Sequence, residues 1–238
     1  MSRYKAAAIH LFFSCLVLAT IFLLIAYVWY PHKMFGLAAG YELLRLIIAV
    51  DLIIGPLVML IIFDAKKKLI KLDVAIILIC QIGFMSYGMW SMFSARPVFL
   101  VFSTEHFYLV RANEIEDKDL LAAKNQDFHH LPLLGPINVG AKIPDSTTLQ
   151  QDMLFAGLGG MGIQNLPQYF VPYAQVASEV IKAGKTLQQM GVDEATKQRI
   201  REYESTGLRN SLYLPMVNKT TPLIVVIDAK TAQITDVI

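Results

Sequence analysis

The most informative polar residue of this sequence is a single carboxylate within a long apolar run. Asp51 is the only acidic residue between Leu43 and Phe63. A carboxylate within a bilayer costs about 2.5–3.5 kcal/mol on insertion scales, and such residues usually face protein and find a partner there. Two interpretations follow for the Asp51 carboxyl. It either contacts an incoming transmembrane helix or forms a hydrogen bond within its own chain, to Gln81 or Ser86.

A glycine–proline step follows Asp51 after one helical turn, at Gly55 and Pro56. Proline removes a backbone donor and bends a helix, and glycine allows a second helix to approach closely. The step either offers a place for a partner helix or only shapes the helices of this chain, and the second interpretation is favoured. Together with Asp51 and Gln81, these residues are the candidate contact residues within the membrane.

The rest of the chain lacks recognisable motifs of catalysis or cofactor binding. Gly157, Gly159 and Gly162 fit G-x-G-x-x-G, but a helical pattern precedes them where a dinucleotide site needs a strand. The adjacent His129 and His130 point to opposite sides of an extended chain and lack further ligands nearby. We therefore predict no catalytic residue, no cofactor and no metal site. The net charge of +2 gives no field that favours nucleic acid.

Three apolar runs must position the membrane residues: Ala6–Tyr30, Leu43–Phe63 and Leu72–Phe93. Each exceeds the roughly 20 residues that a helix needs to cross the hydrocarbon. The first run follows Arg3 and Lys5, as in a signal peptide, but its apolar part is too long and no clear cleavage site follows. The sequence therefore predicts a retained anchor and a three-helix transmembrane domain over residues 1–95.

The distribution of basic residues predicts the orientation of these helices. Basic residues cluster before the first run and between the second and third runs: Arg3, Lys5, Lys66, Lys67, Lys68 and Lys71. By the positive-inside rule, both segments are cytoplasmic and everything after Phe93 lies outside, which in a bacterium is the periplasm. Trp29, Tyr30 and Trp90 then fall at the outer interface, as expected of an aromatic belt.

Residues 96–238 are predicted to form an outer α+β domain with a β-hairpin at each end. Val98–Phe102 and His106–Val110 are rich in β-branched and aromatic residues, and Leu223–Ile227 and Ala232–Ile238 repeat this pattern. We expect the two hairpins to share one sheet. The intervening chain is expected to hold a long loop over Asn125–Pro144 and helices over Ala112–Lys124, Asp145–Phe155, Tyr169–Met190 and Asp193–Ser205, the last stopped by Gly207.

Several strings resemble, by their order and spacing, the type IV pilin accessory protein family (TfpX/TfpZ). The resemblance is strongest over roughly residues 1–115. It is carried by Trp29-Tyr30-Pro31, Asp51 with Gly55-Pro56, the lysine-rich loop into Leu72-Asp73, Gln81, Tyr87-Gly88, Arg96-Pro97-Val98, Phe107–Ala112 and Leu223–Ile238 with Asp228-Ala229-Lys230-Thr231 at its turn.

This resemblance implies a bacterial inner-membrane accessory protein that binds a cognate type IV pilin and stabilises it or modulates its assembly into pili. The expected role is chaperone-like and non-catalytic. The partners are then the major pilin and the lipid bilayer. The helices could pack against the pilin helix and the outer domain could meet the pilin head, and the sequence leaves open which half recognises the pilin. Phe107, at the start of one of the resembling strings, is the candidate pilin contact in the outer domain.

Two other functions stay open on the sequence. A membrane enzyme that modifies pilin would need converging polar residues, for which Asp117, Asp119, Asp127 and His129 are the only dense candidates. Their spacing matches no mechanism of a known class. A sensor with a ligand in its outer domain would usually need a cytoplasmic output domain, and the predicted cytoplasmic segments are short.

Overall fold

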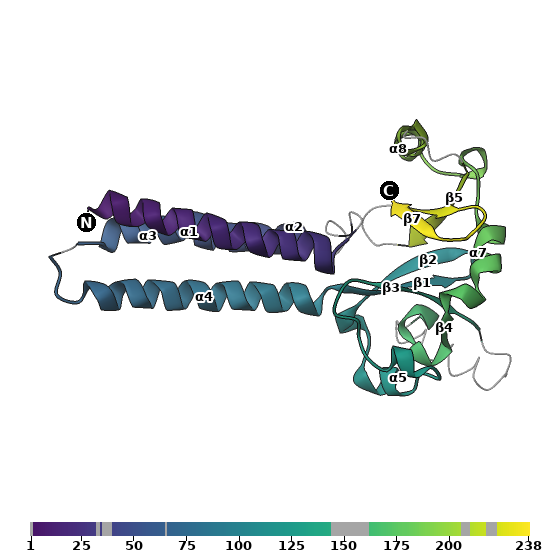
Figure 1. Cartoon of the computed structure of the whole chain (residues 1–238), viewed down its shortest axis with the longest axis horizontal. Coiled ribbons are helices and arrows are strands. Elements are labelled where there is room, and N and C mark those ends of the chain that lie inside the picture. Colours follow the sequence, from purple (N-terminus) through teal and green to yellow (C-terminus); the bar gives the residue numbers. More distant parts are fainter. Residues whose placement is uncertain are drawn as a thin grey trace.

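A computed structural model describes residues 2–31, 34, 40–64, 66–143, 162–205, 210–217 and 223–238. Long helices lie side by side as a rod, and a sheet domain follows at one end of that rod (Figure 1). The N-terminus lies at the far end of the rod, and the C-terminus lies in the sheet domain (Figure 1). The chain is therefore an α-helical bundle followed by an α+β domain, as predicted.

Three of the described helices are long and apolar enough to cross a membrane: Arg3–Trp29, Leu44–Ile62 and Ile70–Ser94. They confirm the three predicted runs to within a few residues at each end. The first consists of α1 (Arg3–Leu24) and the π-helix η1 (Ile25–Trp29). The second consists of α2 (Gly40–Ile48), the π-helix η3 (Ala49–Ile54) and α3 (Gly55–Ile62), and the third is α4 (Ile70–Ser94).

The outer end of the bundle, next to the sheet domain, is closed by aromatic side chains. The hydroxyl of Tyr30 donates a hydrogen bond to the Met92 carbonyl at 2.7 Å, and the rings of Trp29 and Phe93 lie 5.2 Å apart. Tyr30 is thus buried at this end of the bundle and does not face the lipid. Trp90 does face outward, with 66% of its surface exposed.

The outer domain is built on one seven-stranded sheet with the order β4-β3-β1-β2-β5-β6-β7. The strands are β1 (Pro97–Ser103), β2 (His106–Arg111), β3 (Ile137–Ala141), β4 (Phe170–Pro172), β5 (Ser211–Val217), β6 (Leu223–Asp228) and β7 (Ile234–Val237). The hairpins β1–β2 and β6–β7 share this sheet, as predicted. They are joined by β5, which runs parallel to β2 and antiparallel to β6.

Strand β1 has a hydrophobic core on each of its two faces. Phe99 and Val101 pack into a cluster with Leu120 of α5 (Asp117–Leu121), on one side of the sheet. Leu100 and Phe102 point the other way and pack against α7 (Ala177–Ala183). Successive side chains of a strand alternate between faces, so a run of five apolar residues suits a strand that is covered on both sides.

Two expectations for the outer domain are wrong. The helix predicted over Tyr169–Met190 is α-helical only in α7, with short 3₁₀ turns at Tyr173–Gln175 and Leu187–Gln189. It does not begin earlier because Pro172 ends a short extended segment, β4, that pairs with β3. The loop predicted over Asn125–Pro144 contains β3, which pairs parallel to β1. Parallel pairing joins segments that are far apart in sequence, and local composition does not indicate it.

The other helix predictions have mixed outcomes. The helix predicted over Ala112–Lys124 shortens to α5, and the helix predicted over Asp193–Ser205 is confirmed as α8 (Glu194–Ser205). The helix predicted over Asp145–Phe155, the glycines Gly157 and Gly159, and the helix stop at Gly207 lie outside the described residues.

Candidate functional site

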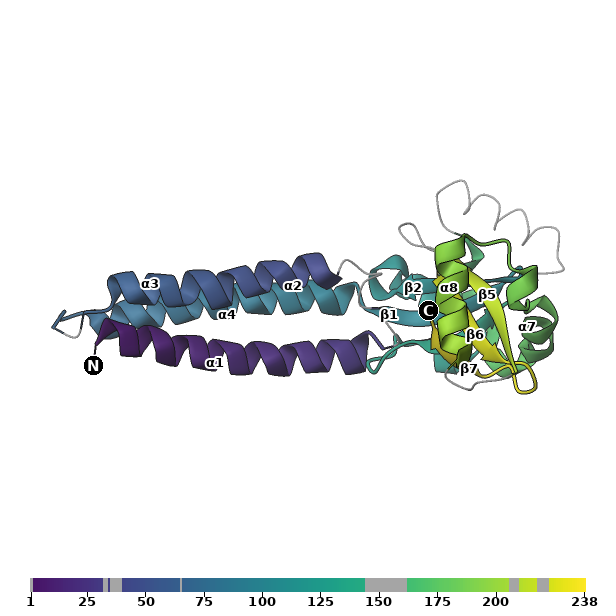
Figure 2. The same ribbon diagram turned by 90° about the horizontal axis from the view of Figure 1, so that it is seen from above.

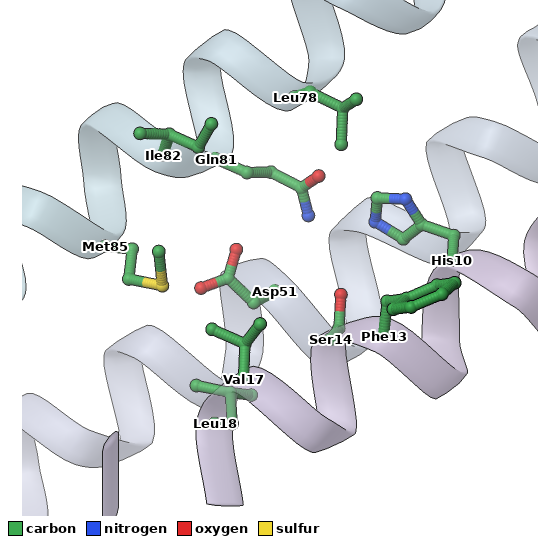
Figure 3. A pocket seen from close by; sticks show the side chains of 10 residues that line it. All are labelled: His10, Phe13, Ser14, Val17, Leu18, Asp51, Leu78, Gln81, Ile82 and Met85. Carbon is green, nitrogen blue, oxygen red and sulfur yellow. The ribbon is translucent and has the colours of Figure 1, made fainter. Parts of the chain in front are cut away.

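A cavity of about 150 Å³ lies between α1, η3 and α4, around the central turns of the bundle. Figure 3 shows its lining side chains. They are His10, Phe13, Ser14, Val17, Leu18, Asp51, Leu78, Gln81, Ile82 and Met85. Most of these side chains are apolar, so the few polar groups determine what the cavity can recognise.

Three polar side chains, one from each helix, meet in this cavity. His10, Asp51 and Gln81 are at most 9% exposed, and their polar ends point toward one another (Figure 3). His10 Nε2, Asp51 Oδ2 and Gln81 Nε2 are all buried, and none of these three atoms makes a hydrogen bond of good geometry to another described residue. The Gln81 side chain lies close enough to interact with both His10 and Asp51, but it does not saturate either group. A buried polar atom without a partner costs about 1–3 kcal/mol. The site therefore contains unused hydrogen-bonding capacity inside an apolar medium.

Gly55 makes room for this polar cluster. A Cβ atom at Gly55 would lie 2.1 Å from Gln81 Nε2 and 2.8 Å from His10 Nε2, so any other residue would displace both side chains. The glycine gap is thus filled by this chain's own residues, as expected from the interpretation in which the step shapes the bundle. Pro56 follows at the start of α3 and is half-buried.

The backbone around Asp51 departs from a regular α-helix. Asp51 lies in the π-helix Ala49–Ile54, which ends directly before Gly55 and Pro56. Pro56 has no N–H to give to the preceding turn, and π-helical turns often occur where a helix accommodates such a defect or a functional residue. The wider turn presents Asp51 to the cavity and also to a second, mainly apolar cavity of about 190 Å³, which is lined partly by α2 and α4.

The cavity opens to the outside of the bundle between α1 and α4. The second span packs against both of these helices through α3, α2 and η3, whereas α1 and α4 scarcely approach each other. Phe13 and Val17 of α1 and Leu78 and Ile82 of α4 line the cavity and are 41–58% exposed. We call the opening that these four residues flank the α1–α4 groove. Its rim is apolar, and its floor carries the polar cluster.

The structure brings together three of the residues predicted for the site. Asp51 and Gln81 line the cavity, and Gly55 lies against the Gln81 side chain. Pro56 directly follows Gly55 in the sequence. Of the two internal partners considered for Asp51, Gln81 lines the same cavity, whereas Ser86 is exposed and does not line it.

Phe107 requires a correction. It is fully buried in the sheet core, with its ring 5.4 Å from that of Phe102 and 6.4 Å from that of Tyr173. A partner can touch this side chain only if the core opens. Phe107 therefore belongs to the packing of the outer domain and not to its surface.

Sequence reasoning missed His10. Its signal was present, since an ionisable residue within a membrane span is a functional hypothesis by default. It was overlooked because nothing in the sequence indicates that this face of the first helix meets Asp51. Ser14 lies one turn further along α1 and lines the same cavity.

The polar residues considered for catalysis in the outer domain are not gathered in one pocket. Asp127 lines a shallow surface hollow with Lys124, Asn125 and strand β4, and Asp117, Asp119 and His129 do not line it. His129 Nε2 lies 3.0 Å from the Ala123 carbonyl oxygen, which engages this ring nitrogen.

Comparison with known proteins gives three clear similarities, all to proteins of Dichelobacter nodosus. The chain is 26% identical over 232 residues to "Fimbrial assembly protein, serogroup I", covering 94% of this chain and 90% of that protein. It is 25% identical over 232 residues to the serogroup E1 protein, with the same coverage. It is 31% identical over 113 residues to the protein of serogroups C1 and C2, covering 47% of this chain and 86% of that protein. No family model and no solved structure matches the chain.

Proposed function

We propose that this chain, which belongs to the fimbrial assembly protein family, is a membrane accessory protein that binds the transmembrane helix of a type IV pilin and modulates pilus assembly. The names of the relatives support a role in fimbrial assembly. The observation that carries the finer proposal is the α1–α4 groove, whose floor holds three buried polar atoms without partners. This role agrees with the resemblance of the sequence to the type IV pilin accessory proteins.

A transmembrane helix is the occupant that fits both the rim and the floor of the groove. Lipid tails match the apolar rim, but they offer nothing to the polar atoms of His10, Asp51 and Gln81. A helix can present apolar side chains to the rim and one hydrogen-bonding group to the floor. Hydrogen bonds between helices in model peptides are worth about 1–2 kcal/mol, enough to favour one docking register over others.

The proposed mode of action is chaperone-like and non-catalytic. The groove opens sideways between α1 and α4, so a pilin helix can enter from the bilayer and leave into it without passing through the bundle. With the basic segments Arg3–Lys5 and Lys66–Lys71 in the cytoplasm of a bacterium, the outer domain lies in the periplasm beside the pilin head. The chain would then hold pilin in the inner membrane until assembly.

Co-purification tests this proposal. The full chain, carrying an affinity tag, is produced together with the major pilin and isolated in mild detergent. We expect pilin to co-purify, and we expect a pilin whose membrane helix is replaced by a polyleucine helix to be lost. Equal recovery of both pilins would contradict helix recognition. A change in pilin mass that depends on this chain would support the enzyme hypothesis instead.

A further inference from the structure

An uncharged loop of the outer domain, Leu131–Pro136, carries two strongly exposed leucines. Leu133 is 61% exposed. Leu134 is 82% exposed, which is more than any other large apolar side chain among the described residues. Two adjacent leucines held in water are costly, because apolar surface is stabilised by removal from water. The loop lies in the outer domain ahead of β3; its first residue, Leu131, packs against the sheet core, whereas Leu133 and Leu134 point away from it.

One end of this loop is tied to the outer end of α4 by a buried arginine. Arg96 donates from Nε and Nη2 to the Pro132 carbonyl, at 3.3 and 3.2 Å, and from Nη1 to the Phe93 carbonyl at 2.7 Å. Its guanidinium also lies over the Phe93 ring, 3.7 Å from the ring centre. Burial lowers the pKa of Arg96, but an arginine keeps its charge across physiological pH. The start of the loop is therefore fixed at the end of the third span.

The other end of the loop rests on the end of the first span. Gly135 has a φ of 86°, and a Cβ there would lie 3.2 Å from the Val28 carbonyl oxygen and 3.5 Å from the Pro31 ring. Glycine suits both the left-handed backbone and this close approach. In Figure 2 the teal segment ahead of β3 reaches the end of α1. Leu133 and Leu134 thus lie between two points that are both level with the outer ends of membrane helices.

We propose that Leu133 and Leu134 insert into the outer interface of the lipid bilayer. Exposed aromatic rings mark this depth on the spans themselves, since Tyr27 is 76% exposed and Trp90 is 66% exposed near the same ends. Aromatic rings of this kind collect at the level of the lipid head groups. The loop has no charge to favour a polar protein surface. Lipid is therefore its occupant, and the insertion holds the outer domain against the membrane independently of any pilin.

Depth measurements on the full chain in lipid vesicles test this proposal. Cys15 and Cys80 are first replaced by alanine, because both are free and exposed. An environment-sensitive fluorophore is then attached at Leu134→Cys or, as a control, at Lys230→Cys. Lys230 is exposed and lies in the β6–β7 turn, at the end of the domain away from the bundle (Figures 1 and 2).

The label at Leu134→Cys is expected to emit at shorter wavelength than the control label. Nitroxide lipids labelled near the head group should quench it, and aqueous iodide should not. The control label should show the reverse. Leu133→Cys provides a second position in case one replacement disturbs the loop. Iodide quenching of both loop labels at the level of the control would overturn the proposal, as would shielding of the loop that occurs only when pilin is present.

Discussion

The outer domain and the helix bundle differ in how their buried polar groups are grouped. In the outer domain, the buried hydroxyl of Tyr213 bonds to Glu204 at 3.0 Å, and the Tyr173 hydroxyl donates to the Ala232 carbonyl at 2.8 Å. In the bundle, three buried side chains meet at one cavity and each leaves a polar atom without a partner. Among the described residues, the outer domain also has two buried polar atoms without partners, Asp119 Oδ2 and Gln168 Oε1, whereas in the bundle three such atoms from three helices line one cavity. That clustering is what suits the bundle to receive another molecule.

Packing differs between the two regions in the same sense. The central strands of the sheet are covered on both faces, and β6 has five consecutive buried residues. The bundle is closed at its outer end by Tyr30 and Trp29, but it opens between α1 and α4 around Asp51. Buried polar atoms without hydrogen bonds destabilise a protein, so those in a native structure need an explanation. Binding of another molecule at this cavity is such an explanation.

The largest expected effect on stability comes from a substitution that disrupts the packing of the outer domain. Phe107→Ala should lower the free energy of unfolding of this domain by about 3–5 kcal/mol, because a fully buried ring is replaced by a cavity. Urea unfolding of the full chain in detergent, followed by near-ultraviolet circular dichroism, measures the loss. The control is Leu121→Ala, whose side chain is 69% exposed and should change the midpoint little. A similarly small effect of Phe107→Ala would place this ring outside the core.

The next effect concerns the connection between the two regions. Arg96→Met should cost about 1.5–3 kcal/mol, because the carbonyls of Phe93 and Pro132 lose a charged donor in a buried site. The loop Leu131–Pro136 should become sensitive to protease, and the urea midpoint should fall. Lys182→Met changes an exposed cation of α7 and serves as the control. Unchanged protease sensitivity in Arg96→Met would show that the arginine does not hold the loop.

A substitution in the bundle should have the opposite effect on stability. Asp51→Leu removes a buried carboxyl whose Oδ2 has no hydrogen bond of good geometry, so we expect the bundle to gain about 1–3 kcal/mol while pilin recovery falls about tenfold. Thermal unfolding in detergent and co-purification measure the two quantities. Ile53→Leu, at an exposed position of the same π-helix, should change neither. Undiminished pilin recovery with Asp51→Leu would show that the polar cluster does not contribute to pilin binding.

The smallest expected effect is a pH dependence in the last hairpin. The backbone N–H groups of Thr231 and Lys230, together with the Thr231 hydroxyl, donate to Asp228 Oδ1 and lower the pKa of this carboxyl. A carboxyl whose folded pKa lies below its unfolded value of about 4 stabilises the fold above that value and loses the effect as pH falls through the folded pKa. The wild-type chain should exceed Asp228→Asn in urea midpoint at neutral pH.

The difference in urea midpoint between the wild type and Asp228→Asn should disappear in acid. The difference between the wild type and Asp228→Asn should stay constant down to about pH 5 and shrink below about pH 4. Parallel urea titrations across this range measure it. A difference that persists unchanged into strong acid would mean that the charge of Asp228 does not contribute.

Local patterns predicted the parts of the fold that depend on near neighbours. The three apolar runs and the two terminal hairpins follow from length and alternation along the sequence, and the structure contains them. Strand β5 was missed because Pro215 interrupts its pattern and because its partners, β2 and β6, are chosen by tertiary pairing. Strand β4 was missed because three residues are too few for a periodic signal.

The site was predicted in part for a similar reason. Asp51 and Gly55 are unusual residues within an apolar helix, so their types alone single them out. His10 lies in another helix, and only the packing of α1 against α3 brings its ring to the Gly55 backbone. Phe107 looked like a contact residue in the sequence, but two hydrophobic neighbours and its strand register place it in the core.

Photo-crosslinking from the rim of the α1–α4 groove tests the central claim most directly. A photoreactive amino acid is placed at Val17 of α1 or at Ile82 of α4, which flank the groove, and at Ile61 of α3, which is 70% exposed but does not line the cavity. We predict adducts with the membrane helix of the pilin from Val17 and Ile82 and none from Ile61. Equal capture from all three positions, or capture from Ile61 alone, would contradict docking of a pilin helix in this groove.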